Sequence, residues 1–402
     1  MSVDNLLLHV NYGLTSGKVI HNCAILCRKG KIFSIGGASA FVDSHHDFRV
    51  DLTDCYAVPG FVDPHIFGFK GFSTVDDKPA ESVLEMAKLL PTHGVTSFMP
   101  SLRAAPVKQQ LRILSELRNI KEESGSQILG VHMVGPYIST AKRGSNPTEG
   151  IRPFDEGELK EIIQAAGDTL KIMTFAPEIK DATRLVEILC ENGIVPSMGH
   201  SIATANHVYD VIEAGARRCT HLYNGMNPLH QRQIGLASTA LVDDRIKVEL
   251  IFDGFHIHPQ MIDLACRAKS KNQVIAVSAA TIGTGLTDGD YEFNDTKITI
   301  EDQHCRLEDG TISGSMITQE MAWKNLLEFT HYKPHDAISC FTSNPAEDLS
   351  LDDRGLLQPG KNADIVVLNE KHEVVLTLVK GEIAYIKNPE IIKKNEPAPV
   401  DS

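Results

Sequence analysis

The stretch IVPSMGHSIATANHVYDVIEAGARRCTHL, residues 194–222, decides the fold. Its two apolar runs, 194–198 and 218–222, have the length of buried strands, and residues 203–214 between them repeat apolar side chains at helical spacing. Parallel strands need such a crossover helix, so the stretch predicts a strand–helix–strand unit. One strand leads into His200 and the other into His221.

This unit recurs through the central part of the chain. Helical segments, the clearest at 81–90, separate most of the apolar runs, which are 57–62, 95–99, 128–131, 172–176, 194–198, 218–222, 248–252 and 274–277. Eight strands that alternate with helices are typical of a (β/α)₈ barrel. A doubly wound open sheet is the alternative, but no GxGxxG follows the first strand.

The two ends of the chain differ from this central part. Residues 1–57 and 355–392 contain short β-branched runs punctuated by glycine turns, and together they predict one small sheet domain. The barrel would then comprise residues 58–354. Residues 393–402, which contain two lysines and two prolines, are expected to be a frayed tail.

Composition narrows the possible partners. The 402 residues include 39 Lys and Arg against 52 Asp and Glu, a net charge of −13, which disfavours nucleic acids and membrane surfaces. An anionic small molecule would need a local basic pocket. The eight cysteines form no CxxC, the N-terminus lacks a signal peptide, and no apolar run approaches the ~20 residues of a membrane span. We therefore expect a cytoplasmic protein with free thiols.

Histidines at adjacent strand ends point to a metal ion. The chain has 17 histidines, and His200 and His221 would lie side by side at the carboxyl end of the barrel. Each imidazole can bind zinc at ~2.0–2.1 Å, so the pair predicts a shared metal site. His256 and His258 form a second, less favoured pair, because they lie beyond a strand end where a common face is not assured.

Ten motifs in register carry a resemblance over nearly the whole chain. They are PGFVDPH, GVTSFMPS, GVHMVGPYIS, TFAPE, GHS, THLYNGMNPLHQR, ELIFDGFHIHP, GLTDG, SGS and NPAEDLSLDDRGLLQPGKNADIVVL. The chain resembles the N-acetylglucosamine-6-phosphate deacetylases of the amidohydrolase superfamily. The resemblance implies a barrel completed by a small β-sandwich built from both chain ends. It also implies hydrolysis of an N-acetyl group by a metal-bound water, with an aspartate after strand 8 as general base.

Part of the catalytic set implied by the resemblance is missing. His200, His221 and His65 match metal histidines, but Phe67 stands at the second histidine of the HxH motif. Val134 stands at the position of the metal-binding glutamate, and Ala279 at that of the catalytic aspartate. Neither side chain can bind a metal or move a proton. We expect one zinc or other divalent metal to be weakly bound or absent, and the hydrolysis to be impaired.

More of the family's substrate-binding residues than of its catalytic residues are present in this sequence. Asn224, Gly225, Arg232 and His256 match the residues that hold the sugar phosphate, whereas Asn146 stands at a histidine that contacts substrate. An arginine suits a phosphate because it donates two parallel charge-assisted hydrogen bonds. The resemblance therefore implies an amino-sugar phosphate as ligand. It also implies a homodimer, since the family pocket takes part of this cluster from a neighbouring subunit.

Three functional hypotheses remain open at this point. The chain could bind a sugar phosphate without deacetylating it, as a sensor, a scaffold or a partner of an active paralogue. It could be an enzyme with altered chemistry that uses Asp253, His65 or His132 as acid or base. It could be a true deacetylase if the two losses were misaligned, although Gly135-Pro136 fixes the position of Val134.

Overall fold

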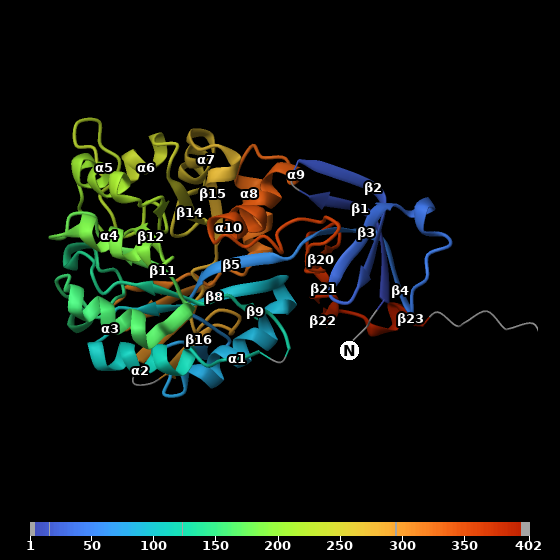
Figure 1. The fold of residues 1–402 in the computed structure, drawn as a ribbon, viewed down its shortest axis with the longest axis horizontal. Helices are drawn as coiled ribbons and strands as arrows, with labels where there is room; N and C mark the ends of the chain where they lie inside the picture. The colour runs from blue at the N-terminus through green and yellow to red at the C-terminus, as the bar shows by residue number, and fades with distance from the viewer. Residues whose placement is uncertain (1–4, 16, 123, 294–295, 395–402) are drawn as a thin grey trace, which may run out of the picture.

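The computed structural model describes residues 5–15, 17–122, 124–293 and 296–394 (Figure 1). A parallel sheet forms the (β/α)₈ barrel, as predicted. Its strands are β5 (Phe61–Ile66), β8 (Val95–Arg103), β10 (Val131–Val134), β11 (Leu170–Phe175), β12 (Val195–Met198), β13 (Arg218–Cys219), β14 (Lys247–Ile251) and β15 (Val274–Val277), paired in that order. The last strand approaches the first, because the Ala279 amide donates to the His65 carbonyl at 2.9 Å.

Helices cover the outside of the barrel (Figure 1). They are α1 (Pro79–Leu89), α2 (Val107–Leu117), α3 (Glu156–Ala166), α4 (Ala182–Glu191), α5 (Ala205–Ala214), α6 (Leu236–Val242), α7 (Pro259–Ala268) and α8 (Gln319–Phe329), followed by the short α9 (Pro334–Ala337) and α10 (Ser343–Asp348). Local sequence sets their ends. The Asp155 side chain accepts from the Glu158 amide at the start of α3, and Pro259 opens α7.

A separate sheet unites the two chain ends, at the right of Figure 1. Its strands are β1 (Asn5–Thr15), β2 (Lys18–Arg28), β3 (Lys31–Gly37), β4 (Phe48–Pro59), β20 (Ile365–Leu368), β21 (Val374–Val379), β22 (Glu382–Ile386) and β23 (Ile392–Lys394). They are ordered β22-β21-β20-β4-β1-β2-β3, with β23 on β4. They enclose their own apolar core, which confirms the small β-sandwich. Lys393 and Lys394 of the expected tail belong to β23, and residues 395–402 lie outside the described residues.

Further small strands lie beyond the barrel strands or beside them. An antiparallel sheet of β16 (Gly289–Phe293), β17 (Thr296–Glu301), β18 (His304–Leu307) and β19 (Ile312–Gly314) follows β15. The others are β6 (Gly68–Phe69), β7 (Phe72–Ser73) and β9 (Gln127–Ile128). The Phe255 ring stacks on His304 with 3.8 Å between the ring centroids, so the four-stranded sheet flanks the carboxyl end of the barrel.

Two strand boundaries differ from the sequence expectation. The run 57–62 is divided at Gly60 between β4 of the sandwich and β5 of the barrel, and a Cβ at Gly60 would lie 2.1 Å from a Thr96 side-chain atom. The run 128–131 is replaced by β10, which extends to Val134. Val134 is therefore a buried strand residue. It shares the inward face of β10 with His132, because side chains alternate along a strand.

Candidate functional site

Three strand ends at the barrel mouth have unusual backbone geometry. His200 after β12, His221 after β13 and Ala279 after β15 have φ angles of 47°, 33° and 45°. Residues other than glycine rarely adopt this left-handed conformation, and such strain gathers at functional sites. In (β/α)₈ barrels the chemistry is placed at this same end of the strands. The mouth around these residues is therefore the candidate functional site.

The two predicted metal histidines meet there. Nε2 of His200 lies 3.1 Å from Nε2 of His221. Nδ1 of His200 donates to the Lys142 carbonyl at 2.7 Å, so the lone pair of the neutral ring is on Nε2. Burial lowers the pKa of His200 to about 4 and that of His221 well below its ordinary value, so both rings are neutral at pH 7. With His200 in this tautomer, the short contact is a hydrogen bond when His221 carries its proton on Nε2.

The surroundings of this pair offer a metal ion few further ligands. Asn146 is oriented by two hydrogen bonds, since its Oδ1 accepts from the Ala104 amide and its Nδ2 donates to the Arg143 carbonyl. Its Nδ2 lies 3.4 Å from His200 Nε2, so an N–H group faces the nitrogen that would bind the metal. Val134, the last residue of β10, offers no ligand atom. A catalytic zinc normally has three protein ligands. The nearest further imidazole is that of His65, whose ring centroid lies 5.8 Å from that of His221 and whose Nε2 has no hydrogen-bond partner.

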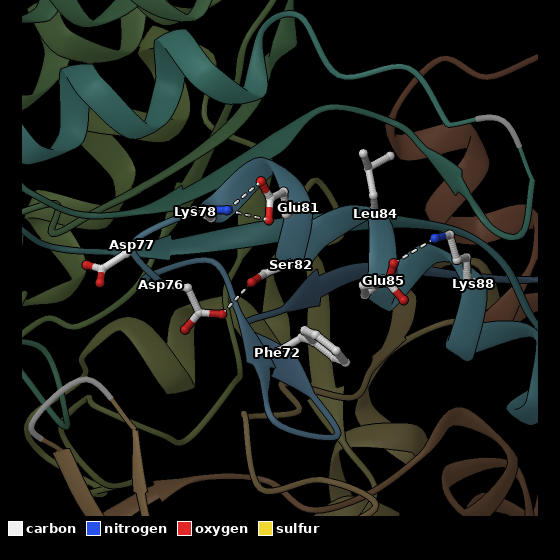
Figure 2. Close-up of a pocket in the computed structure, with 9 residues that line it drawn as sticks. All are labelled: Phe72, Asp76, Asp77, Lys78, Glu81, Ser82, Leu84, Glu85 and Lys88. Carbon is white, nitrogen blue, oxygen red and sulfur yellow. Dashed lines mark hydrogen bonds and ion pairs between the residues drawn. The ribbon is translucent and has the colours of Figure 1, made fainter.

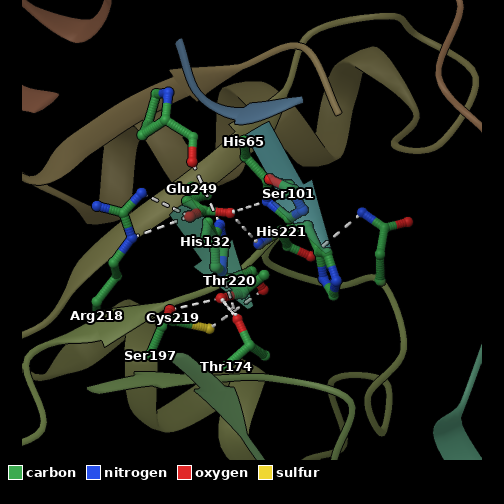
Figure 3. A network of polar contacts seen from close by, with 12 residues as sticks. His65, Ser101, His132, Thr174, Ser197, Arg218, Cys219, Thr220, His221 and Glu249 are labelled. Atoms are coloured by element: carbon green, nitrogen blue, oxygen red, sulfur yellow. Dashed lines mark hydrogen bonds and ion pairs between the residues drawn. The ribbon is translucent and has the colours of Figure 1, made fainter. Parts of the chain in front are cut away.

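A second group of potential ligands lies deeper in the barrel. Within the described residues, His65, His132 and Glu249 form the one set of three such side chains whose ligand atoms lie within 4.8 Å of one another. Both oxygens of the Glu249 carboxylate already accept hydrogen bonds (Figure 3). Its Oε2 accepts from His65 Nδ1 at 2.8 Å and from the His221 amide at 3.1 Å, and its Oε1 accepts from Arg218 Nη2 at 2.6 Å.

The remaining contacts make this group an ion network, in which Nε2 of His65 has no hydrogen-bond partner. His132 contacts the Pro64 carbonyl through Nδ1 and the Thr174 hydroxyl through Nε2 at 2.8 Å, so both of its nitrogens have partners. Arg218 also binds Asp348. Burial alone would raise the pKa of Glu249, but the Arg218 guanidinium and the His65 ring hold it well below the ordinary range. The carboxylate is thus ionised and paired with the Arg218 guanidinium. The positive charge of that guanidinium would repel a metal cation.

The sequence reasoning missed this network. The structure brings His65 close to His221, with 5.8 Å between the ring centroids, but it also pairs His65 Nδ1 with Glu249 at 2.8 Å. The available signal was a charged residue inside an apolar strand. Glu249 interrupts the run 248–252 and Arg218 begins the run 218–222, and a charge buried in a barrel strand needs a partner across the interior.

His256 is held in a fixed orientation at the mouth. Its Nδ1 lies 2.6 Å from Asp253 Oδ2, which also accepts from the Ser315 hydroxyl at 3.0 Å. The other oxygen of Asp253 accepts from the amides of Phe255 and His256. Burial opposes ionisation of Asp253, but the hydrogen bonds from His256 outweigh it and lower its pKa. The ring nitrogen Nε2 of His256 is therefore the one left for a ligand.

The other predicted phosphate residues lie on the segment that follows His221. The Asn224 side chain donates to the carbonyls of His221 and Leu222, both at 3.3 Å. Gly225 has φ +60°, and a Cβ there would lie 2.9 Å from Nδ1 of His200, so this position needs glycine. Arg232 lies on an exposed stretch and forms no ion pair with the described residues. No contact joins it to Asn224 or His256.

A hollow at the start of α1 is not part of the candidate site. It measures about 460 Å³ and is lined by Phe72, Asp76, Asp77, Lys78, Glu81, Ser82, Leu84, Glu85 and Lys88 (Figure 2). Its lysines pair with its own glutamates, Lys78 with Glu81 and Lys88 with Glu85. None of the mouth histidines lines it.

Comparisons with known proteins agree with this architecture. The profile of the amidohydrolase family matches residues 56–384. N-acetylglucosamine-6-phosphate deacetylase of Bacillus subtilis is 34% identical over 390 residues, 95% of this chain and 98% of that protein. N-acetylgalactosamine-6-phosphate deacetylase of Escherichia coli O157:H7 is 30% identical over 81% of this chain and 87% of its own length.

Solved structures of relatives superpose on the whole fold. The N-acetylglucosamine-6-phosphate deacetylase of Thermotoga maritima superposes with a TM-score of 0.84 at 33% identity, covering 95% of this chain and 100% of that one. A variant of the Mycobacterium smegmatis enzyme, with one aspartate replaced by alanine, was solved with N-acetyl-D-glucosamine-6-phosphate. It superposes with a TM-score of 0.86 at 28% identity, over 95% of this chain and 99% of that one. Across the described residues, no helix is long and apolar enough to cross a bilayer.

Proposed function

The chain belongs to the N-acetylglucosamine-6-phosphate deacetylases of the amidohydrolase family, and from that premise we propose that it binds an amino-sugar phosphate without hydrolysing its N-acetyl group. The contact between Asn146 Nδ2 and His200 Nε2 carries this proposal, because an N–H donor faces the nitrogen that would hold the metal. Ala279 adds a second obstacle. Its methyl group stands where the resemblance places the general base, and loss of a general base costs about 10²–10⁴-fold in rate.

Other residues at the mouth support the proposal that the chain still binds the sugar phosphate. Asn224 and Gly225 lie beside the histidine pair, His256 is oriented by Asp253, and Arg232 is a cation without a counter-ion among the described residues. The Mycobacterium smegmatis variant offers a parallel, because a relative that lost an aspartate to alanine was captured with the sugar phosphate. We expect the ligand to be N-acetylglucosamine 6-phosphate or its galactosamine isomer, since relatives act on each.

We propose that the functional unit is a homodimer in the cytoplasm. Leu229 and Ile234 are exposed apolar side chains on the same segment as Arg232. Asn227 of that segment donates a hydrogen bond to the carbonyl of Ile202, another exposed apolar residue. A second copy would cover them and bring its own Arg232 close to the site. Analytical ultracentrifugation tests this, and a monomer at micromolar concentration would contradict it.

Altered chemistry is the second candidate, and one observation favours it. The Asp253–His256 pair is an oriented carboxylate and imidazole at the mouth, which is the arrangement that a general base needs. His65 and His132 are less suited to that role, because both are fully buried in the ion network.

Two measurements test the proposed function. Acetate release from N-acetylglucosamine 6-phosphate, with added zinc, should stay far below an ordinary turnover of about 1 s⁻¹. Calorimetry should show that the phosphorylated sugar binds and that free N-acetylglucosamine does not. Arg232→Met should weaken the binding, whereas Arg267→Met, an exposed arginine on α7, should not. Rapid acetate release would overturn the catalytic part, and equal affinity for both sugars would overturn the binding part.

A further inference from the structure

A second cavity opens beside the mouth, between the segments that follow β5, β8 and β15. Its volume is about 480 Å³, which is the size of a small-molecule site. About half of its lining residues are apolar, and they include Phe67, Leu102, Ile113, Ile282, Phe293 and Ile298. The Asn146 side chain, bonded to the Ala104 amide, belongs to the segment that separates this cavity from the histidine pair.

One cationic side chain, that of Arg103, belongs to the wall of this cavity. Arg103 ends β8, and its Nη2 donates to the Ser313 carbonyl at 2.6 Å. Its guanidinium carbon lies 5.3 Å from the centroid of the Phe67 ring. Among the described residues Arg103 forms no ion pair with a carboxylate, in contrast to Arg218 and Arg152, which are paired with Glu249 and Glu158.

An uncompensated guanidinium in such a wall is unfavourable unless an anion joins it. Burial lowers the pKa of Arg103, yet arginine stays charged in proteins. Gln110, which also lines the cavity, accepts a hydrogen bond from Arg152 through its Oε1 at 2.7 Å, and its Nε2 has no hydrogen-bond partner. The wall therefore has a cation that lacks a counter-ion and a donor that lacks an acceptor, which is the composition of an anion site.

The rim limits which anion can enter. Asp76, Asp77 and Glu149 line the same cavity, and their charges repel a ligand with two negative charges about twice as strongly as a ligand with one. We propose that this cavity binds a small monocarboxylate with an apolar body, with the carboxylate on Arg103 and the body against Phe67 and Ile298. The proposed contacts use neither Arg232 nor His256, so variants at those residues distinguish this cavity from the amino-sugar phosphate site.

The wild-type protein can be tested with para-bromobenzoate as the probe. Crystals soaked in it should show anomalous bromine density inside the cavity, with the carboxylate oxygens on Arg103. In solution it should bind at least about 10-fold more tightly than para-bromobenzamide, which has the same shape and no charge, and more tightly than phenyl phosphate, a dianion. Equal affinity for the acid and the amide, tighter binding of phenyl phosphate, or bromine elsewhere would overturn the proposal.

Variants separate this site from the proposed function. Arg103→Met should weaken para-bromobenzoate about 10-fold or more and leave the affinity for N-acetylglucosamine 6-phosphate unchanged, and Arg232→Met should do the reverse. Arg267→Met should change neither. If Arg103→Met does not fold, Arg103→Lys keeps the charge but loses the planar fork, and it should still bind the acid better than the amide. Undiminished binding by Arg103→Met would overturn the proposal even if the sugar phosphate binds as expected.

Discussion

The side-chain amide of Asn146 points its Nδ2 at Nε2 of His200, 3.4 Å away. That nitrogen holds the only lone pair of the His200 ring, because Nδ1 donates to the Lys142 carbonyl. Histidines that bind metals commonly fix their tautomer through such a second-shell carbonyl. The pair thus keeps the orientation suited to a metal while a hydrogen-bond donor faces the position of the ion.

Introducing a carboxylate should create zinc dependence. Val134 shares the inward face of β10 with His132, so Val134→Glu places a buried carboxylate at the strand end beside the histidine pair. Without zinc we expect the melting temperature to fall, since an unpaired buried charge is costly. Zinc at about 100 times its Kd should return about 2.7 kcal/mol of stability. Calorimetric scans of Val134→Gln, which adds similar bulk without charge, provide the control, and an equal response to zinc in both variants would contradict the expectation.

Removing the cation of the buried network should be severely destabilising. Arg218→Met leaves the Glu249 carboxylate buried without its guanidinium, and loss of one partner of a buried pair costs about 3–5 kcal/mol. Urea unfolding measures this difference. The exposed Arg245, which pairs with Asp243, is the matched control, and Arg245→Met should change stability by only about 0.5 kcal/mol. A loss below about 1 kcal/mol in Arg218→Met would show that the network contributes little.

Asp63 should make stability depend on pH. Burial raises its pKa to about 6, against hydrogen bonds from Ser278 and from the His65 amide. The folded state therefore favours the protonated acid, so this favourable contribution is present below the unfolded pKa of about 3.9 and is lost as the pH rises through 6. Asp63→Asn should match the wild type near pH 4 and exceed it by roughly 2–3 kcal/mol near pH 8. A difference that does not change with pH would contradict the raised pKa.

Gly225 should not tolerate a side chain. Its φ is +60° and an added Cβ would lie 2.9 Å from His200 Nδ1, so Gly225→Ala combines backbone strain with a clash. We expect a loss of about 1–3 kcal/mol and weaker binding of the sugar phosphate. Gly37 is the matched control, because it has an ordinary φ of −66° and no atom within 4 Å of an added Cβ. Equal melting temperatures for Gly225→Ala and Gly37→Ala would contradict this.

The sequence predicted the barrel because strand and helix periods alternate clearly and because His200 and His221 follow strands. It also located Val134 and Ala279, since flanking motifs fix their positions. It could not locate the partners of buried charges. Glu249 and His65 are 184 residues apart, and the contact between them depends on how the strands close into a barrel. The sequence could not single out Arg103 either. What distinguishes Arg103 is the lack of an ion pair, which depends on three-dimensional packing and not on sequence spacing.

The joining of both chain ends in one sheet has a consequence for biosynthesis. Pro59 of β4 pairs with Ile365 of β20, so about 300 residues must be synthesised before β4 meets this partner. At about 5–20 residues per second, the nascent N-terminal strands wait roughly 15–60 s with an unpaired edge. Such an edge is a template for misassociation between nascent chains. The domain that begins the chain is therefore the last to be completed, and the barrel between its two parts is synthesised while the edge of β4 is still open.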